Sequence, residues 1–339
     1  MKAVRNRNLA FVVLAFLGLL FFSRTLHAQP VNVEAAKKEG KVVVYGLVLP
    51  QSMDTINKPF EKKYGIRVEY WRAAPNRVMD RALTEWRAGR PGFDVVEGTR
   101  AVGLIMRKEG LFTKYIPPSS EKLPDQFKEK DGEMTPWRAV PIGILYNTEL
   151  VKGADIPKSL QDLLNPKWKK KLSLSDPTQH TSSAGFLQNL EKIMGPKWLE
   201  YVKALARQEP HLVESWAPVP NVIIRGEALV GITLVKYVKQ FKGPVDYAML
   251  DKFLTDANYL GLSAKGPNPN AGRLYMEYAI SPEGQRGIAA DGEFVLYPGV
   301  NPDIRDADKV IARAVFMDPP TEEEFIKLKE EFHKIFFAK

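Results

Sequence analysis

Three short β-branched segments, separated by two segments of helical period, constrain the fold of this chain most strongly. The strand-like segments are "KVVVY" (41–45), "RVEYW" (67–71) and "FDVVEG" (93–98), and the helical segments cover 53–65 and 76–89. Apolar residues recur every three or four positions in both helical segments. The order strand, helix, strand, helix, strand predicts a parallel α/β sheet with right-handed crossovers.

A similar alternation resumes after a Pro- and Lys-rich segment, 114–136, which we expect to be an exposed connection. At 339 residues the chain is long enough for two lobes. The fold class is therefore α/β, with a first lobe from 29–138 and 262–339 and a second from 139–261. Further strands are predicted in "WRAVPIGILYN", "KKKLSLSDP", "HLVES", "ALVGITL" and 245–265, and helices over 182–195, 196–208, 270–292 and the C-terminal segment.

Residues 1–28 have the pattern of a secretory signal peptide. A basic start precedes a 14-residue apolar stretch, Leu9–Phe22, and a cut is expected after Ala28. That stretch is short for a membrane span of roughly 20 residues. The large Leu26, three positions before the cut, leaves an uncleaved N-terminal anchor as the alternative. We expect cleavage near Ala28 and a periplasmic protein.

Charge and cysteine content narrow the function classes. The predicted signal peptide carries four basic residues and no acidic one, so the mature chain is less basic than the +9 of the full sequence. This weakens a nucleic-acid function, which needs basic residues concentrated on one face. The chain has no cysteine, which excludes a lipid-anchored lipoprotein, a thiolate nucleophile and a zinc–thiolate site. We expect a monomer that diffuses freely.

Two α/β lobes joined by crossover strands suggest a ligand cleft, because open sheets bind ligands at the carboxyl ends of their strands. Residues of the strand-to-helix turns would line that cleft. The chain has none of the common catalytic or nucleotide-binding motifs, so we expect no catalytic residues and no cofactor. The candidate ligand-binding residues are Tyr45, Gly46, Arg72, Asn76, Thr99, Tyr146, His180, Thr181, Ser182, Ser183, Trp216, Lys236 and Tyr237.

The segment "DPTQHTSSAG" is the strongest of these elements. One of Thr181, Ser182 and Ser183 is expected to cap the following helix, and the others could donate hydroxyl groups to an anion. Capping alone is the competing interpretation. His180 lies in the same turn, although a lone histidine is more often structural.

The other candidates each have a structural alternative. Arg72 could bind a carboxylate or phosphate with two hydrogen bonds, or form a surface salt bridge. Asn76 could contact the ligand or cap its helix, and Trp216 could stack on a ligand or pack in the core. Lys236 could face the cleft or the solvent.

Six sequence blocks in this order resemble the extracellular solute-binding proteins of bacterial ABC importers, in the branch that includes ferric-ion-binding proteins. The blocks are "EGKVVVYG", "GFDVVEGT", "YNTELV", "NPKWKKKLSLSDP", "RGEALVGIT" and "LGLSAKGPNPNAGRLYMEYAISPEGQ". The resemblance covers residues from about Val31 to about Asp318. It implies a type 2 periplasmic-binding fold that closes on a small-molecule ligand by a hinge and delivers it to the permease subunits.

Iron is the sharpest question that the resemblance raises. Iron-binding members hold the metal with two adjacent tyrosines, which fall on Lys236 and Tyr237 here, and some add a tyrosine at the position of Tyr146. An ammonium group beside the metal position opposes Fe³⁺ binding. We therefore expect no metal and favour a small organic or phosphorylated anion. The alternatives are a ferric ion or ferric chelate held by Tyr146 and Tyr237, and an exported sensory module or enzyme of the same fold.

Overall fold

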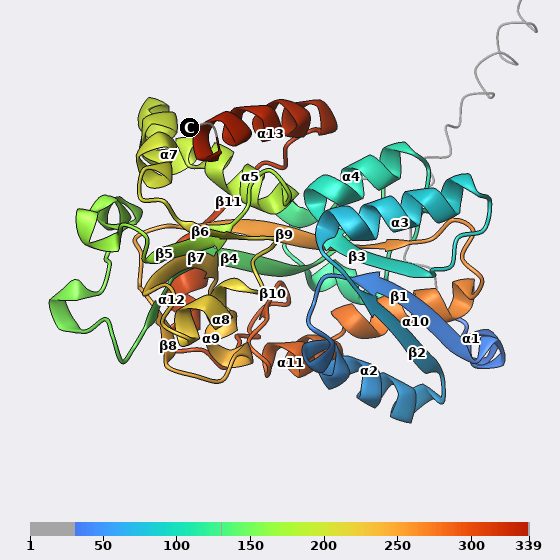
Figure 1. Cartoon of the computed structure of the whole chain (residues 1–339). Helices are drawn as coiled ribbons and strands as arrows, with labels where there is room; N and C mark the ends of the chain where they lie inside the picture. The colour runs from blue at the N-terminus through green and yellow to red at the C-terminus, as the bar shows by residue number, and fades with distance from the viewer. Residues whose placement is uncertain (1–30, 130, 338–339) are drawn as a thin grey trace, which may run out of the picture.

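The computed structural model describes residues 31–129 and 131–337 and shows one continuous mixed sheet (Figure 1). Its strands are β1 (Lys41–Gly46), β2 (Arg67–Arg72), β3 (Val95–Thr99), β4 (Thr135–Asn147), β5 (Leu172–Ser175), β6 (His211–Val213), β7 (Val230–Leu234), β8 (Val245–Tyr247), β9 (Phe253–Leu262), β10 (Phe294–Val295) and β11 (Ala314–Phe316). The strand order is β2-β1-β3-β9-β4-β7-β5-β6, with β8 and β10 paired to β4 and β11 paired to β9.

Helices cover both faces of the sheet (Figure 1). They are α1 (Val33–Glu39), α2 (Pro50–Tyr64), α3 (Pro75–Arg87), α4 (Arg100–Lys108), α5 (Thr181–Asn189), α6 (Glu191–Met194), α7 (Trp198–Ala206), α8 (Val219–Ile224), α9 (Tyr237–Gln240), α10 (Pro269–Ile280), α11 (Pro282–Ala289), α12 (Ala307–Ala312) and α13 (Glu322–Phe336). In this view α3, α4, α5, α7 and α13 lie above the sheet, and α1, α2, α10 and α11 lie below it.

The predicted parallel unit at the start of the chain is confirmed. Strand β1 pairs in parallel with both β2 and β3, with Gly46 opposite Arg72 and Val44 opposite Val95. Helix α2 ends at Gly65, whose φ of 69° lies in the left-handed region that glycine tolerates. Because the strands run in parallel, β1, β2 and β3 all end at the same edge of the sheet.

Strands β4 and β9 join two halves of the molecule. The first half is built on β1, β2 and β3, and the second half is built on β5, β6 and β7. Residues 135–141 of β4 pair with β9, whereas 142–146 pair with β7 in the other half of the sheet. Strand β9 also pairs antiparallel with β3. Every residue of β4 and β9 is buried. These two crossing strands therefore form the floor between the halves.

Two long elements predicted from the sequence are divided in the structure. The expected strand 245–265 is two strands, β8 and β9, which pair with different partners. The expected helix 270–292 is two helices, because Ser281 is extended and caps α11 by accepting a hydrogen bond from Gly284 N. Pro282 then begins α11 and cannot continue the hydrogen bonding of α10.

The C-terminal residues do not follow the expected division into lobes. The sequence interpretation placed 262–339 in the first lobe, but α13 contacts α5 and α7 of the second half. The side chain of Asn189 at the end of α5 donates to the Asp318 carbonyl and accepts from the Asp318 N–H group. Helix α13 buries Leu328 and Phe332, so this covering of α5 and α7 removes apolar surface from water.

The expected exposed connection 114–136 also contributes to the core. Tyr115, Leu123 and Phe127 are buried, and the segment ends in the first residues of β4.

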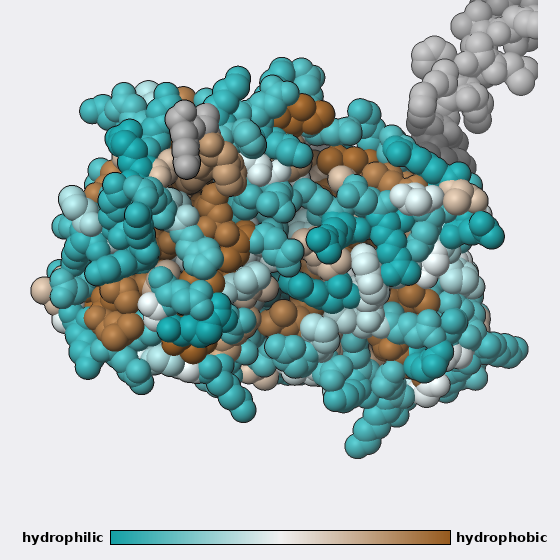
Figure 2. Space-filling view, in the orientation of Figure 1, coloured by the Kyte–Doolittle hydropathy of each residue, from teal (hydrophilic) through white to brown (hydrophobic). Residues whose placement is uncertain are grey.

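Most of the face shown in Figure 2 is hydrophilic, and its hydrophobic residues lie in separate small groups. No helix within 31–129 or 131–337 is long and apolar enough to cross a membrane. The predicted signal peptide, 1–28, lies outside the described residues.

Candidate functional site

A small cavity lies between the two halves of the molecule, above the crossing strands. Its volume is about 50 Å³, enough for one or two water-sized groups. Its walls come from the carboxyl ends of β1, β2 and β3, from β4 and β9, and from the second half of the chain. The lining residues are Leu47, Arg72, Ala73, Ala74, Pro75, Thr99, Arg138, Val140, His180, Ser182, Ser215, Trp216, Ala217, Leu234, Lys236, Tyr237, Asp256 and Asn258.

Arg72 brings a positive charge to this cavity. It is the last residue of β2, and its Nε donates to the Leu47 carbonyl at 3.3 Å. Among the described residues, no carboxylate forms an ion pair with its guanidinium group. The predicted surface salt bridge is therefore absent from this part of the chain, and the terminal N–H groups remain available for the bidentate binding of an oxyanion.

Two helices begin at the cavity without a side-chain cap. The N-cap residues of α3 and α4 are Ala74 and Thr99, and neither side chain accepts a hydrogen bond from its helix. The first backbone N–H groups of a helix have no partner within the helix and attract negative charge. The hydroxyl oxygen of buried Thr99 has no partner among the described residues either. This part of the wall therefore offers several donors.

Asn76 does not cap α3, contrary to one of its two predicted roles. It is the second residue of the helix, and its side chain connects the walls of the cavity instead. Its Nδ2 donates to the Gln179 carbonyl at 2.9 Å, and its Oδ1 accepts from Thr181 Oγ1 at 3.0 Å. The loop before α5 is thereby held against the start of α3.

The three hydroxyl groups of α5 are directed at protein acceptors. Thr181 donates to Asn76, Ser182 donates to Asp256 at 2.9 Å, and Ser183 donates to the Ser175 carbonyl at 2.7 Å. None of them caps the helix, so that prediction is wrong. A hydroxyl group has one hydrogen to donate, and these groups are therefore unavailable as donors to an anion in this arrangement.

His180 is the N-cap residue of α5. Its Nδ1 accepts a hydrogen bond from Ser183 N at 3.3 Å. Burial, with a smaller contribution from the positive charge of Arg72, lowers the pKa of His180 to about 3. The imidazole is therefore neutral at physiological pH, and because Nδ1 accepts, the proton lies on Nε2. His180 lines the cavity as a neutral donor, a role that its sequence position suggested but did not specify.

Trp216 packs as a buried side chain in the same wall. Its Nε1 donates to Ser182 Oγ at 3.4 Å, and its ring meets those of His180 and Phe186 edge to face. The hydrogen bonds thus run from Trp216 through Ser182 to Asp256. Of the two predicted roles, packing is the one that the described contacts show.

Lys236 is buried and lines the cavity, which is one of its two predicted placements; it does not face the solvent. Its ammonium group forms an ion pair with Glu293, which also binds Arg138 at 2.8 Å; Arg138 in turn binds Glu97 at 2.6 Å. Burial alone would raise the pKa of Glu293, but Arg138 and Lys236 hold it below its ordinary value. The two cations and two carboxylates balance, so Lys236 adds little net charge to the cavity.

The two tyrosines considered for iron do not meet. Tyr237 lines the cavity, whereas Tyr146 lies near the end of β4, opposite Val230 of β7 and Asp246 of β8. Burial raises the pKa of both phenols, which opposes formation of the phenolates that a ferric ion needs. The described His, Asp and Glu residues include no group of three or more that could hold a metal ion.

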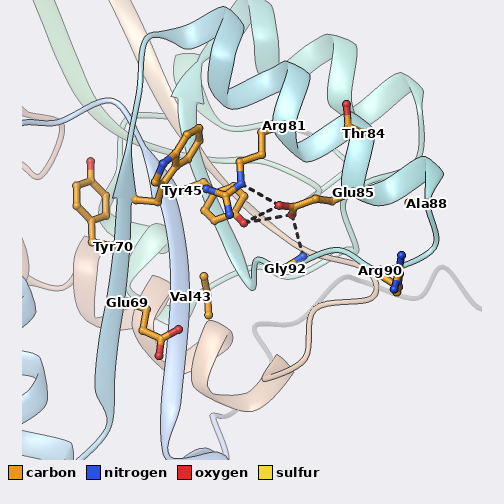
Figure 3. Close-up of a pocket in the computed structure, with 11 residues that line it drawn as sticks. Val43, Tyr45, Glu69, Tyr70, Arg81, Thr84, Glu85, Ala88, Arg90 and Gly92 are labelled. Carbon is orange, nitrogen blue, oxygen red and sulfur yellow. Dashed lines mark hydrogen bonds and ion pairs between the residues drawn. The ribbon is translucent and has the colours of Figure 1, made fainter.

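Tyr45 faces a different part of the surface, shown in Figure 3. Its hydroxyl donates to Glu85 at 3.0 Å, and the same carboxylate accepts from Arg81 Nε and Gly92 N. The Arg81 guanidinium lies 4.4 Å from the Tyr45 ring centroid and 4.3 Å from that of Trp71. These groups line an open depression of about 610 Å³, but they satisfy one another and lie outside the cavity.

Gly46 is also outside the cavity lining. A Cβ atom at this position would lie 2.7 Å from the hydroxyl of Tyr70 and 3.0 Å from an oxygen of Glu97. Its role is therefore to let Tyr70 and Glu97 approach the end of β1. Neither Tyr45 nor Gly46 reaches the place where the sequence interpretation put a ligand.

Sequence reasoning missed three polar residues of the floor, namely Arg138 of β4 and Asp256 and Asn258 of β9. All three are buried and line the cavity. The sequence feature that could have indicated them is a polar residue inside an otherwise apolar strand. In "FLTDANYLGL" Asp256 and Asn258 are two positions apart and therefore share one face.

The fold and this cavity between its two halves define a two-lobed solute-binding protein of the type 2 periplasmic-binding class. The chain belongs to the bacterial extracellular solute-binding protein family, whose model matches residues 55–317. The resemblance inferred from the six sequence blocks is thereby confirmed.

Two proteins of known sequence are similar to this chain. The chain is 28% identical over 122 residues to a probable ABC transporter periplasmic-binding protein of Sinorhizobium fredii. This match spans 36% of this chain and 34% of that relative, about a third of its length. It is 24% identical over 272 residues to an uncharacterised protein of Haemophilus influenzae, covering 74% of this chain and 76% of that protein.

Three solved structures share the fold at lower identity. The substrate-binding protein of an ABC transporter from Agrobacterium tumefaciens has a TM-score of 0.78 at 14% identity, covering 88% of this chain and 96% of that one. AfuA from Actinobacillus pleuropneumoniae, with fructose-6-phosphate bound, has 0.76 at 20%, covering 88% and 99%. Iron-bound HitA from Pseudomonas aeruginosa has 0.70 at 18%, covering 86% and 99%.

Proposed function

We propose that this protein is the solute-binding component of an ABC importer and that it binds a small organic or phosphorylated anion in the cavity. The observation that carries this proposal is Arg72. Its guanidinium group lines the cavity, and no carboxylate of the described residues pairs with it. An arginine without a carboxylate partner in a confined polar space is suited to bind an oxyanion.

The groups around Arg72 support the same ligand charge. The uncapped starts of α3 and α4 add backbone donors, and the neutral imidazole of His180 adds its Nε2–H group. The ion-paired cluster around Glu293 is close to neutral and does not compete for the ligand. An anion would therefore meet donors on this side of the cavity.

Binding of such a solute requires the two walls to separate. The cavity has a volume of only about 50 Å³, and a solute larger than a few atoms needs more space. The crossing strands β4 and β9 are suited to act as the hinge, since each pairs with strands of the first half and continues toward the second. Closure on the ligand would then present both halves to the permease subunits.

The test is a thermal-shift and calorimetric screen of the mature chain with phosphate, phosphonates, phosphate esters, carboxylates, polyamines and ferric citrate. An anion should raise the melting temperature by mass action, and Arg72→Gln should remove that effect. Arg67→Gln is the matched control, because Arg67 lies on the same strand but pairs with Glu69 away from the cavity. A shift with polyamines alone, or conversion of the ligand to a product, would contradict the proposal.

The same proposal includes export with removal of residues 1–28. The family is extracellular, and an importer component of this kind works outside the inner membrane. Mass spectrometry of the protein from the periplasmic fraction should find Gln29 as the first residue. A full-length N-terminus in the membrane fraction would favour the anchored form instead.

A further inference from the structure

The floor of the cavity has a different chemistry from the wall that carries Arg72. Asp256 and Asn258 lie two residues apart on β9, line the cavity and are both at least nine-tenths buried, with 9% and 3% exposure. Each presents oxygen acceptors. An anionic group cannot satisfy an acceptor, so these two side chains must serve another part of the solute.

The orientation of the Asn258 amide is set by its neighbour. Its Nδ2 donates to Glu97 Oε1 at 2.9 Å, which leaves Oδ1 on the other side of the group. That oxygen has no hydrogen-bond partner among the described residues. A buried acceptor without a partner costs free energy, and such groups are rare in folded proteins. A donor from the bound solute would satisfy it.

Two neighbours of Asn258 across the sheet each carry one polar atom without a hydrogen-bond partner. The strand register places it opposite Thr99 of β3 and Arg138 of β4. Side chains directly opposite each other share one face of the sheet. Thr99 Oγ1 and Arg138 Nε both lack a partner among the described residues. The floor therefore combines an acceptor, Asn258 Oδ1, with a donor, Arg138 Nε–H.

A hydroxyl group matches this combination, because it donates one hydrogen bond and accepts others. An ammonium group donates only, so it would leave Arg138 Nε without a partner. Asp256 supports the same orientation of the solute. Its carboxylate accepts from Ser182 at 2.9 Å and can accept further bonds, while its negative charge would repel an anionic group placed at the floor.

We infer that the solute is an anion that also bears a hydroxyl group, and that Asn258, Arg138 and Asp256 receive this hydroxyl while Arg72 binds the anionic group. This inference rests on the proposed function and deepens it. It narrows the solute from any small anion to hydroxylated phosphates, phosphonates or carboxylates. The floor residues Asn258, Arg138 and Asp256 then select for the hydroxyl group, and Arg72 on the wall attracts the negative charge.

The test compares three compounds of similar size that differ in one group, namely 2-hydroxyethylphosphonate, propylphosphonate and 2-aminoethylphosphonate. Calorimetry on the mature protein should show that the hydroxylated compound binds at least about tenfold more tightly than the propyl compound. Asn258→Ala should abolish this preference and leave the weaker affinity for propylphosphonate nearly unchanged. Arg72→Gln should weaken the binding of both compounds.

The outcomes separate this inference from the proposed function. Equal affinity for the hydroxyl and propyl compounds, or the tightest binding for the amino compound, would overturn the hydroxyl assignment and leave anion binding intact. Binding of none of the three at millimolar concentration would overturn both. Because Asn258→Ala could disturb the fold, its melting temperature without ligand is measured as well. Asp256→Asn, which retains an acceptor, provides a second variant and should retain part of the preference.

Discussion

Thr181 donates its hydroxyl hydrogen to the side-chain oxygen of Asn76 at 3.0 Å, and this bond joins the two walls of the cavity. Asn76 donates in turn to the Gln179 carbonyl at 2.9 Å. The Asn76 side chain thus binds both the backbone of the loop before α5, at Gln179, and the hydroxyl group of Thr181, the first residue of α5. These contacts belong to the arrangement in which the two walls lie close together and the cavity is small.

Replacing Asn76 should therefore weaken ligand binding, although the Asn76 side chain holds the two walls together and does not itself bind the ligand. Asn76→Ala removes both hydrogen bonds, each of which stabilises this arrangement by about 1 kcal/mol. We expect about a tenfold loss of anion affinity in calorimetry and a larger radius of gyration in small-angle scattering of the ligand-free protein. Thr84→Val is the control, because Thr84 donates to the Asp80 carbonyl within α3. Unchanged affinity would show that these bonds do not contribute to closure.

Asp256 should make stability depend on pH. Burial is the main cause that raises the pKa of Asp256 to about 6 from an ordinary value of 3.8; Glu97 adds to the increase, while Ser182 and Arg138 oppose it. Between these values the folded state holds the proton and the unfolded chain has lost it. The contribution of Asp256 to the free energy of unfolding is therefore largest at low pH and falls as pH rises from about 4 to about 6.

The variant Asp256→Asn lacks this titration. Relative to the wild type, its free energy of unfolding should rise by on the order of 2–3 kcal/mol between about pH 4 and pH 7. Denaturant unfolding of both proteins across this range measures the difference, in which the other titrating groups largely cancel. A difference that does not change with pH would mean that Asp256 titrates near its ordinary pKa.

The Lys236–Glu293 pair should be essential for stability, although it carries little net charge. Both side chains are buried, and removing one partner of a buried pair typically costs about 3–5 kcal/mol. We expect Lys236→Met to lower the melting temperature strongly and Lys236→Met with Glu293→Gln to recover much of the loss. Lys239→Met is the exposed control, since Lys239 pairs with Asp303 at the surface. Similar small losses in both lysine variants would contradict a buried pair.

Ferric citrate should leave the protein colourless. Tyr237 is buried with a raised pKa, and Tyr146 is outside the cavity, so no pair of phenolates is available to a ferric ion. Visible absorption spectroscopy during a titration with ferric citrate measures this. An absorption band that appears in the wild type and disappears in Tyr237→Phe would contradict the expectation and favour iron.

The fold was predictable where a short segment contained its own signal. Alternating strands and helical periods over 41–98 depend on neighbours within a few residues, and the structure confirms β1, β2 and β3 and the helices between them. The position of α13 was not predictable in this way. Its amphipathic pattern predicts a buried face, but such a face could pack against either half of the molecule. Only the tertiary structure shows that α13 buries Leu328 and Phe332 and contacts α5 and α7 of the second half.

The sequence by itself determined which turns reach the cavity, because strand ends are local features. Seven of the predicted residues line the cavity, namely Arg72, Thr99, His180, Ser182, Trp216, Lys236 and Tyr237. The tertiary structure alone decided what each polar group contacts: Lys236 pairs with Glu293, which lies 57 residues away in the chain, and the hydroxyl of Ser182 points at Asp256, 74 residues away. Hydrogen bonds and ion pairs depend on distances of a few ångströms between remote segments, and no local pattern contains that information.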